Sequence, residues 1–241
     1  MEPDQQAIYL NEYALGGRLT EESFSVRSRT LPPVPDGGVL LETRYLSVDP
    51  YMRGCMTGLD NYYLPQFDLA RPLHSVGIGR VRESRNPEFA EDDLVVGSLE
   101  WSPVSVWHPA EGATRRPGGA LRRIERSTIA PSHHLGALGT TGITAFFGVL
   151  AVACPQPGET FLLSSAAGGV GTVAGQIAKL RGARVYGMTS TAEKRDVLVR
   201  KLGFDAALDY RSPDLVDELR DLMPNGPDIY FDKSGAGSGR R

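Results

Sequence analysis

Residues 166–171 (AAGGVG) form the part of this sequence whose types and spacing best suit chemistry. They match the dinucleotide fingerprint Gly-x-Gly-x-x-Gly, with alanine in place of the first glycine. Gly168 lets the backbone approach a pyrophosphate, and Gly171 lets the next helix pack closely on the preceding strand. With Gly169 and Val170 these are candidate cofactor-binding residues, because the amino end of a helix offers free N–H groups to phosphates. A tight turn without a ligand is the weaker alternative.

The residues about 20 positions beyond such a loop distinguish NAD from NADP. An NAD site usually has Asp or Glu there, but residues 188–191 (MTST) contain no carboxylate, and Lys194 and Arg195 follow. A cation in the first turn of a helix opposes the helix dipole unless an anion binds there. The sequence therefore favours NADPH, with Lys194 on its 2′-phosphate. Tyr210 is a second candidate contact, although a half-buried aromatic at a strand end explains it equally well.

Two other kinds of site lack the residues that they require. A zinc site needs about three or four closely spaced Cys or His ligands. The two cysteines are far apart, and the histidines are isolated except for one adjacent pair that is poorly placed to chelate one ion: Cys55, Cys154, His74, His108, His133 and His134. No Gly-x-Ser-x-Gly motif is present, which argues against a serine hydrolase. We predict no metal.

A polar and aromatic stretch, residues 45–53 (YLSVDPYMR), supplies candidates for a substrate cleft. A cleft beside a nicotinamide needs a hydrogen-bond donor above an apolar floor. Tyr51, Tyr62 and Tyr63 can provide either, although ordinary packing is the better interpretation of any one of them.

Two different patterns divide the chain. Residues 1–125 contain short β-like runs separated by Gly and Pro, which predicts an antiparallel, partly closed barrel. Residues 126–232 alternate strands with helices, which predicts a parallel sheet covered by helices. The glycine-rich residues 233–241 are expected to form a flexible tail. The expected strands are 38–48, 76–81, 94–99, 160–165, 183–188, 205–210 and 228–232, and the expected helices are 170–181, one from 190 to 203 and one beginning at 212–213.

Composition narrows the function classes further. The chain has 241 residues, a net charge of −3 and 41% hydrophobic residues, which suits a globular protein and argues against a nucleic-acid partner. No apolar run approaches the roughly 20 residues of a membrane span, and the acidic amino terminus is unlike a secretory signal. With only two, distant cysteines, a reducing cytoplasm is the expected location.

The chain resembles the zinc-independent medium-chain dehydrogenase/reductases, and within them the prostaglandin reductase / leukotriene B4 12-hydroxydehydrogenase branch, with 15-oxoprostaglandin 13-reductases most similar. The resemblance covers nearly the whole chain up to residue 232. It rests on residues 45–53 (YLSVDPYMR), 138–145 (LGTTGITA), 166–171 (AAGGVG), 174–179 (AGQIAK), 202–207 (LGFDAA) and 228–232 (DIYFD).

This resemblance implies a fold and a reaction. The fold is a GroES-like β-barrel domain followed by a Rossmann-type NADP-binding domain. The reaction is NADPH-dependent reduction of the carbon–carbon double bond of an α,β-unsaturated ketone or aldehyde, through an enolate that a hydrogen-bond donor stabilises. Lys194 and Tyr210 match the 2′-phosphate contacts of the family, and Leu99 and Glu100 match its substrate contacts. The catalytic donor is unassigned, with Tyr51 and Tyr63 as candidates.

The sequence departs from the family after Asp232, where Lys233-Ser234-Gly235 replaces the usual continuation. Only four of about six strands of a doubly wound domain are present, so we expect a C-terminally truncated Rossmann-type domain and a homodimer only for a longer chain. An NADP-binding fragment without catalysis and a quinone reductase of the same superfamily are the alternatives.

Overall fold

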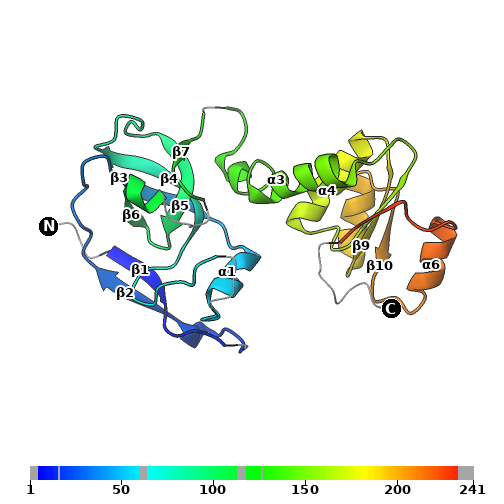
Figure 1. Ribbon diagram of the computed structural model, residues 1–241, viewed down its shortest axis with the longest axis horizontal. Helices are drawn as coiled ribbons and strands as arrows, with labels where there is room; N and C mark the ends of the chain where they lie inside the picture. Colours follow the sequence, from blue (N-terminus) through cyan, green and yellow to red (C-terminus); the bar gives the residue numbers. More distant parts are fainter. Residues whose placement is uncertain (1–4, 16, 60–63, 113–117, 126, 233–241) are drawn as a thin grey trace. The chain divides into compact units, whose positions relative to one another are not determined.

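The computed structural model describes residues 5–15, 17–59, 64–112, 118–125 and 127–232 (Figure 1). Two compact units divide the chain, Met1–Leu135 and Gly136–Arg241. Their boundary lies ten residues beyond the one that the sequence suggests at residue 125. The predicted flexible tail at 233–241 and the candidates Tyr62 and Tyr63 lie outside the described residues.

An antiparallel sheet forms the centre of the first unit. Its five strands run in the order β6-β3-β4-β5-β7, and a separate pair, β1 and β2, is also antiparallel. The strands and helical segments are β1 (Gln5–Leu10), η1 (Glu21–Ser23), β2 (Phe24–Arg29), β3 (Val39–Leu46), α1 (Pro50–Cys55), β4 (His74–Ser84), β5 (Leu94–Glu100), β6 (Val104–Trp107), α2 (Pro109–Gly112), β7 (Arg122–Arg123) and η2 (Pro131–Leu135).

The three strands expected in this half are present as β3, β4 and β5. Alternate residues of each strand enter one core, because side chains of a strand point to opposite faces of the sheet. That core includes Val39, Leu41, Val81, Val95 and Leu99. The antiparallel part of the predicted fold is therefore confirmed.

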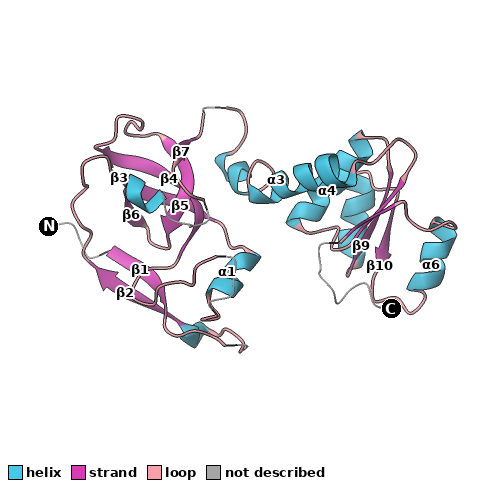
Figure 2. Cartoon of the chain, viewed as in Figure 1, coloured by secondary structure: helices cyan, strands magenta, loops and turns pink. Residues whose placement is uncertain are grey.

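A parallel sheet forms the centre of the second unit, with helices beside its strands (Figure 2). Its strand order is β10-β9-β8-β11. Its strands and helical segments are α3 (Thr140–Phe147), η3 (Gly148–Ala153), β8 (Thr160–Leu163), α4 (Gly169–Leu180), β9 (Arg184–Thr189), α5 (Ala192–Asp196), η4 (Val197–Lys201), β10 (Ala206–Asp209), α6 (Leu215–Leu222) and β11 (Ile229–Phe231).

Helices cover both faces of this sheet. Phe161, Leu163 and Val185 face one core with α3, α4 and η4, whereas Leu162 and Tyr186 face the other with α6. Burial on both sides explains why these short strands read as continuous apolar runs. The predicted strand–helix alternation and doubly wound arrangement are confirmed.

Polar side chains bracket the pairing of β8 with β11. At the amino ends, the amide and hydroxyl of Thr160 donate to one carboxylate oxygen of Asp228, at 2.8 and 2.7 Å, and the Asp228 amide donates to the Thr160 hydroxyl at 2.8 Å. At the carboxyl ends, the Ser164 hydroxyl donates to Asp232 at 2.6 Å. These side chains fix both ends of a pairing whose ladder spans only Ile229–Phe231.

The ends of the helices differ from the sequence pattern in two places. The capping residue of α5 is Thr191, whose hydroxyl accepts the Lys194 amide at 3.3 Å, and not Ser190. Helix α6 begins at Leu215 after Asp214, and not at Ser212-Pro213. The Ser212 hydroxyl accepts the Asp214 amide at 3.2 Å and donates to Glu218 at 2.7 Å, so it contacts the residue before the helix and the first turn of the helix. The expected end of α4 is confirmed, since Gly182 follows it with a φ of +85°.

Candidate nucleotide-binding site

The loop between β8 and α4 is built to expose backbone amides. The Gly168 amide donates to the Ser165 carbonyl at 2.9 Å, and the Gly168 carbonyl accepts the Thr172 amide at 2.9 Å. Helix α4 begins at the next residue, so the amides of Gly169, Val170 and Gly171 have no acceptor within the described part of the chain. The positive end of a twelve-residue helix and three free donors together suit a pyrophosphate.

Gly171 sits where no side chain fits. A Cβ there would lie 2.6 Å from the Ser165 carbonyl oxygen, and 2.7 and 2.8 Å from the carbonyl oxygen and Cα of Ala166. These are backbone atoms of the turn that leaves β8, so they cannot rotate away. The close packing of helix on strand that the motif predicts at this glycine is present.

Alanine at the first position of the motif also has a physical reason. The Ala166 side chain is fully buried, and its amide donates to the Met188 carbonyl at 3.0 Å. A Cβ added to Gly187 of β9 would lie 2.8 Å from the Ala166 Cβ. The alanine methyl therefore occupies space that the glycine in the neighbouring strand leaves free.

Lys194 and Tyr210 follow the carboxyl ends of neighbouring strands, β9 and β10. The Tyr210 amide donates to the Thr189 carbonyl at 3.2 Å, which places the two strand ends side by side. The Lys194 side chain is exposed and has no carboxylate partner among the described residues. Tyr210 is 55% exposed. Both side chains are therefore available at the sheet edge to which the glycine loop belongs, where doubly wound folds bind ligands.

A network beside these residues is not evident from the sequence pattern. The Asp209 carboxylate accepts hydrogen bonds from the Arg195 guanidinium at 3.1 Å and from the Nε of Arg211 at 3.2 Å. A second nitrogen of Arg211 donates to the Ser190 carbonyl at the end of β9. With Ala207, Ser212, Pro213 and Glu218, these three charged residues line an open pocket of about 640 Å³.

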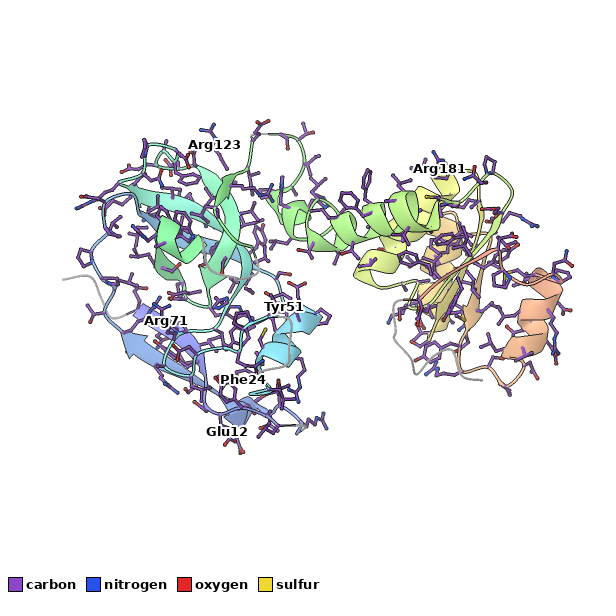
Figure 3. All side chains as sticks on the ribbon, in the orientation of Figure 1. Glu12, Phe24, Tyr51, Arg71, Arg123 and Arg181 are labelled. Carbon is purple, nitrogen blue, oxygen red and sulfur yellow. The ribbon has the colours of Figure 1, made fainter. Side chains whose placement is uncertain are left out.

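The substrate candidates lie in the first unit, each in a different setting. Leu99 is 1% exposed and packs in the core of the antiparallel sheet, whereas Glu100 forms an ion pair with Arg29 of β2. Tyr51 lies on α1 and packs against a core around Met52 (Figure 3). Tyr63 lies outside the described residues. The roles of Leu99, Glu100 and Tyr51 stay predictions.

Metal ligands do not gather anywhere in the described ranges, where no three His, Cys, Asp or Glu side chains are grouped to hold an ion. None of the helices described is both long and apolar enough to cross a membrane.

The two cysteines should differ sharply in reactivity. Cys55 is buried, and burial raises the pKa of its thiol to about 11, whereas Cys154 is exposed. Because the thiolate is the reactive form, a pKa of about 11 leaves on the order of 100-fold less of it than an ordinary thiol has. We expect a thiol-specific disulfide reagent to modify Cys154 rapidly in the native protein, and to modify both Cys154 and Cys55 after unfolding. Cys154→Ser should abolish the rapid phase, and its persistence in that variant would contradict the assignment.

Comparisons with known proteins show what the chain is similar to. A family model described as the N-terminal domain of oxidoreductase matches residues 7–114, and one described as zinc-binding dehydrogenase matches residues 169–240. The chain is 34% identical over 238 residues to 2-alkenal reductase (NADP(+)-dependent) of Nicotiana tabacum, covering 97% of this chain and 67% of that one. It is 37% identical over 220 residues to prostaglandin reductase 1 of Rattus norvegicus, a match that covers 90% of this chain and 61% of that one.

A solved structure is similar over the same extent. CurA from Vibrio vulnificus in complex with NADPH superposes with a TM-score of 0.84 at 30% identity, covering 96% of this chain and 66% of that one. The chain thus spans roughly three fifths to two thirds of the length of these proteins.

Proposed function

The chain belongs to the zinc-independent medium-chain dehydrogenase/reductase family, and from this membership we propose that it is an NADPH-dependent reductase of α,β-unsaturated ketones and aldehydes. Within the family we assign it to the prostaglandin reductase branch, with 15-oxoprostaglandins among its substrates and a cytoplasmic location. The relatives named for alkenal and prostaglandin reduction support this choice.

The observation that carries the proposal is the composition of one sheet edge. Among the described residues, the amides of Gly169, Val170 and Gly171 after β8 have no acceptor, and Lys194 after β9 has no carboxylate partner. No carboxylate stands at the end of β9, where an NAD site places one for the ribose 2′-hydroxyl. The residues present therefore fit NADPH better than NADH.

Each part of this edge has a distinct role in the proposal. The loop amides bind the pyrophosphate, and Lys194 and Tyr210 bind the 2′-phosphate. When bound, NADPH supplies the hydride that reduces the β-carbon of the enone. Charge then develops on the carbonyl oxygen, so a hydrogen-bond donor is required there, and Tyr51 and Tyr63 are the candidates. A proton that reaches the α-carbon completes the reduction. Leu99 and Glu100 are the proposed substrate contacts.

The test separates coenzyme binding from turnover. Calorimetry with NADPH and NADH measures binding, and the loss of absorbance of reduced nicotinamide measures turnover with nonenal, 15-oxoprostaglandin and a quinone. We expect binding of NADPH and oxidation with the two enones. Binding without turnover would indicate an NADP-binding fragment, faster oxidation with the quinone would indicate a quinone reductase, and no binding by folded protein would refute the proposal.

A further inference from the structure

Arg211 combines a fixed orientation with free hydrogen-bond donors. Its Nε donates to Asp209, and its Nη2 donates to the Ser190 carbonyl and, at 3.3 Å, to Asp209. The remaining nitrogen, Nη1, has no acceptor among the described residues, and the side chain is 58% exposed. A guanidinium held on one edge and open on the other is well suited to bind a phosphate.

Asp209 holds this guanidinium in place. One of its carboxylate oxygens accepts the Arg211 amide at 3.0 Å and the Arg211 Nε at 3.2 Å, and the other accepts Arg195 at 3.1 Å. The backbone N–H of Arg211 is the largest cause that lowers the pKa of Asp209, and both guanidinium groups add to it against the opposing effect of desolvation. Two arginines share one carboxylate, so the network keeps a net positive charge.

The position of the network connects it to the predicted phosphate contacts. Tyr210 lies between Asp209 and Arg211 in the chain. Ser190, whose carbonyl binds Arg211, immediately precedes Thr191, and the Thr191 hydroxyl accepts the Lys194 amide. The Arg211 side chain thus bridges the end of β10 to the turn that presents Lys194.

We propose that Arg211 is a specificity-determining residue that adds a second cation to the 2′-phosphate contact, and that Asp209 is the positioning residue that orients it. This inference rests on the proposed use of NADPH. In the coenzyme complex, the free Nη1 edge of Arg211 donates to the phosphate, while Asp209 and the Ser190 carbonyl hold the opposite edge.

The test measures the dissociation constants of NADPH and NADH for the full chain by calorimetry. A charge-assisted hydrogen bond contributes about 1.5–3 kcal/mol, which corresponds to roughly 10- to 100-fold in affinity. Arg211→Ala should therefore raise the dissociation constant of NADPH at least about tenfold and leave that of NADH within about twofold. Arg211→Lys should recover part of the loss. Arg200→Ala, which removes an exposed arginine of η4, is the matched control and should change neither.

The role of Asp209 has a separate readout. Asp209→Asn should reduce the preference for NADPH about threefold without weakening NADH binding, and Asp209→Glu should restore part of it. Equal weakening of both coenzymes by Asp209→Asn would show a merely structural role and overturn the positioning assignment. Unchanged preference in Arg211→Ala would overturn the role of Arg211 alone, whereas a wild-type chain without any preference for NADPH would refute the proposed coenzyme itself.

Discussion

Replacing Lys194 with glutamate should weaken NADPH binding about 100-fold and leave NADH binding within about threefold of the wild type. Two unit charges about 4 Å apart interact by roughly 1 kcal/mol in water. A phosphate monoester carries about −1.5 to −2 charges at neutral pH, and the substitution reverses the sign of its partner. The binding free energy of NADPH should therefore differ by about 3 kcal/mol between the wild type and the variant, before screening by salt, and this corresponds to a change in affinity of about 100-fold. Calorimetric titration at low ionic strength measures it.

A second charge reversal provides the control for Lys194→Glu. Lys201 is another exposed lysine, located at the end of η4, so Lys201→Glu changes the net charge of the chain equally. It should alter the affinity for neither coenzyme appreciably. If Lys194→Glu weakened NADPH and NADH alike, or no more than Lys201→Glu does, the 2′-phosphate would not lie at Lys194.

Replacing Gly171 with alanine should destabilise the second unit by about 3 kcal/mol and remove measurable coenzyme binding. Overpacking costs typically about 1–3 kcal/mol, and the upper end applies because the added Cβ would meet backbone atoms within 2.8 Å. Either α4 moves away from β8 or the loop deforms, and both displace the free amides. Denaturant unfolding and a coenzyme titration measure the two effects.

The matched control for Gly171→Ala is Gly169→Ala in the same loop. A Cβ at Gly169 would lie 3.4 Å from a methyl carbon of Thr141, which is ordinary contact. This variant should unfold at nearly the wild-type denaturant concentration. Equal destabilisation by both substitutions would show that helix α4 does not need a glycine at residue 171 in particular.

The glycine loop and the strand–helix order could be predicted because both are local patterns. The loop is a continuous motif, and the apolar runs of the second half are short and bounded by Gly or Pro. The starts of α5 and α6 could not be predicted as well, because the chain offers two adjacent capping residues at Ser190-Thr191 and two nearby ones at Ser212 and Asp214. In the folded chain the Thr191 hydroxyl accepts the Lys194 amide at the start of α5, and the Ser212 hydroxyl accepts the Asp214 amide just before α6. The capping pattern alone does not distinguish between the residues of each set.

The Asp209 network shows a different limit of sequence reasoning. The sequence shows an aspartate, Asp209, two residues before an arginine, Arg211, at the end of an expected strand, which indicates a possible ion pair. Which other charged side chains join Asp209 depends on how β9 and β10 pair, and the sequence alone does not show this. The burial of the Leu99 side chain could be predicted from the sequence, because Leu99 alternates with Gly97 and Val95 along one strand. Its predicted substrate role came from a family resemblance and not from that alternation.

The hydrogen-bonded side chains at the two ends of the β8–β11 pairing limit how freely this part of the sequence can vary. Thr160 with Asp228, and Ser164 with Asp232, each fit only one alignment of the two strands, and a slip by one residue would break both sets of hydrogen bonds together. Alignment is thus encoded in four polar side chains, while the intervening apolar residues need only fill volume. Sequence tolerance should therefore be higher in the middle of these strands than at their ends, the reverse of what core burial alone suggests.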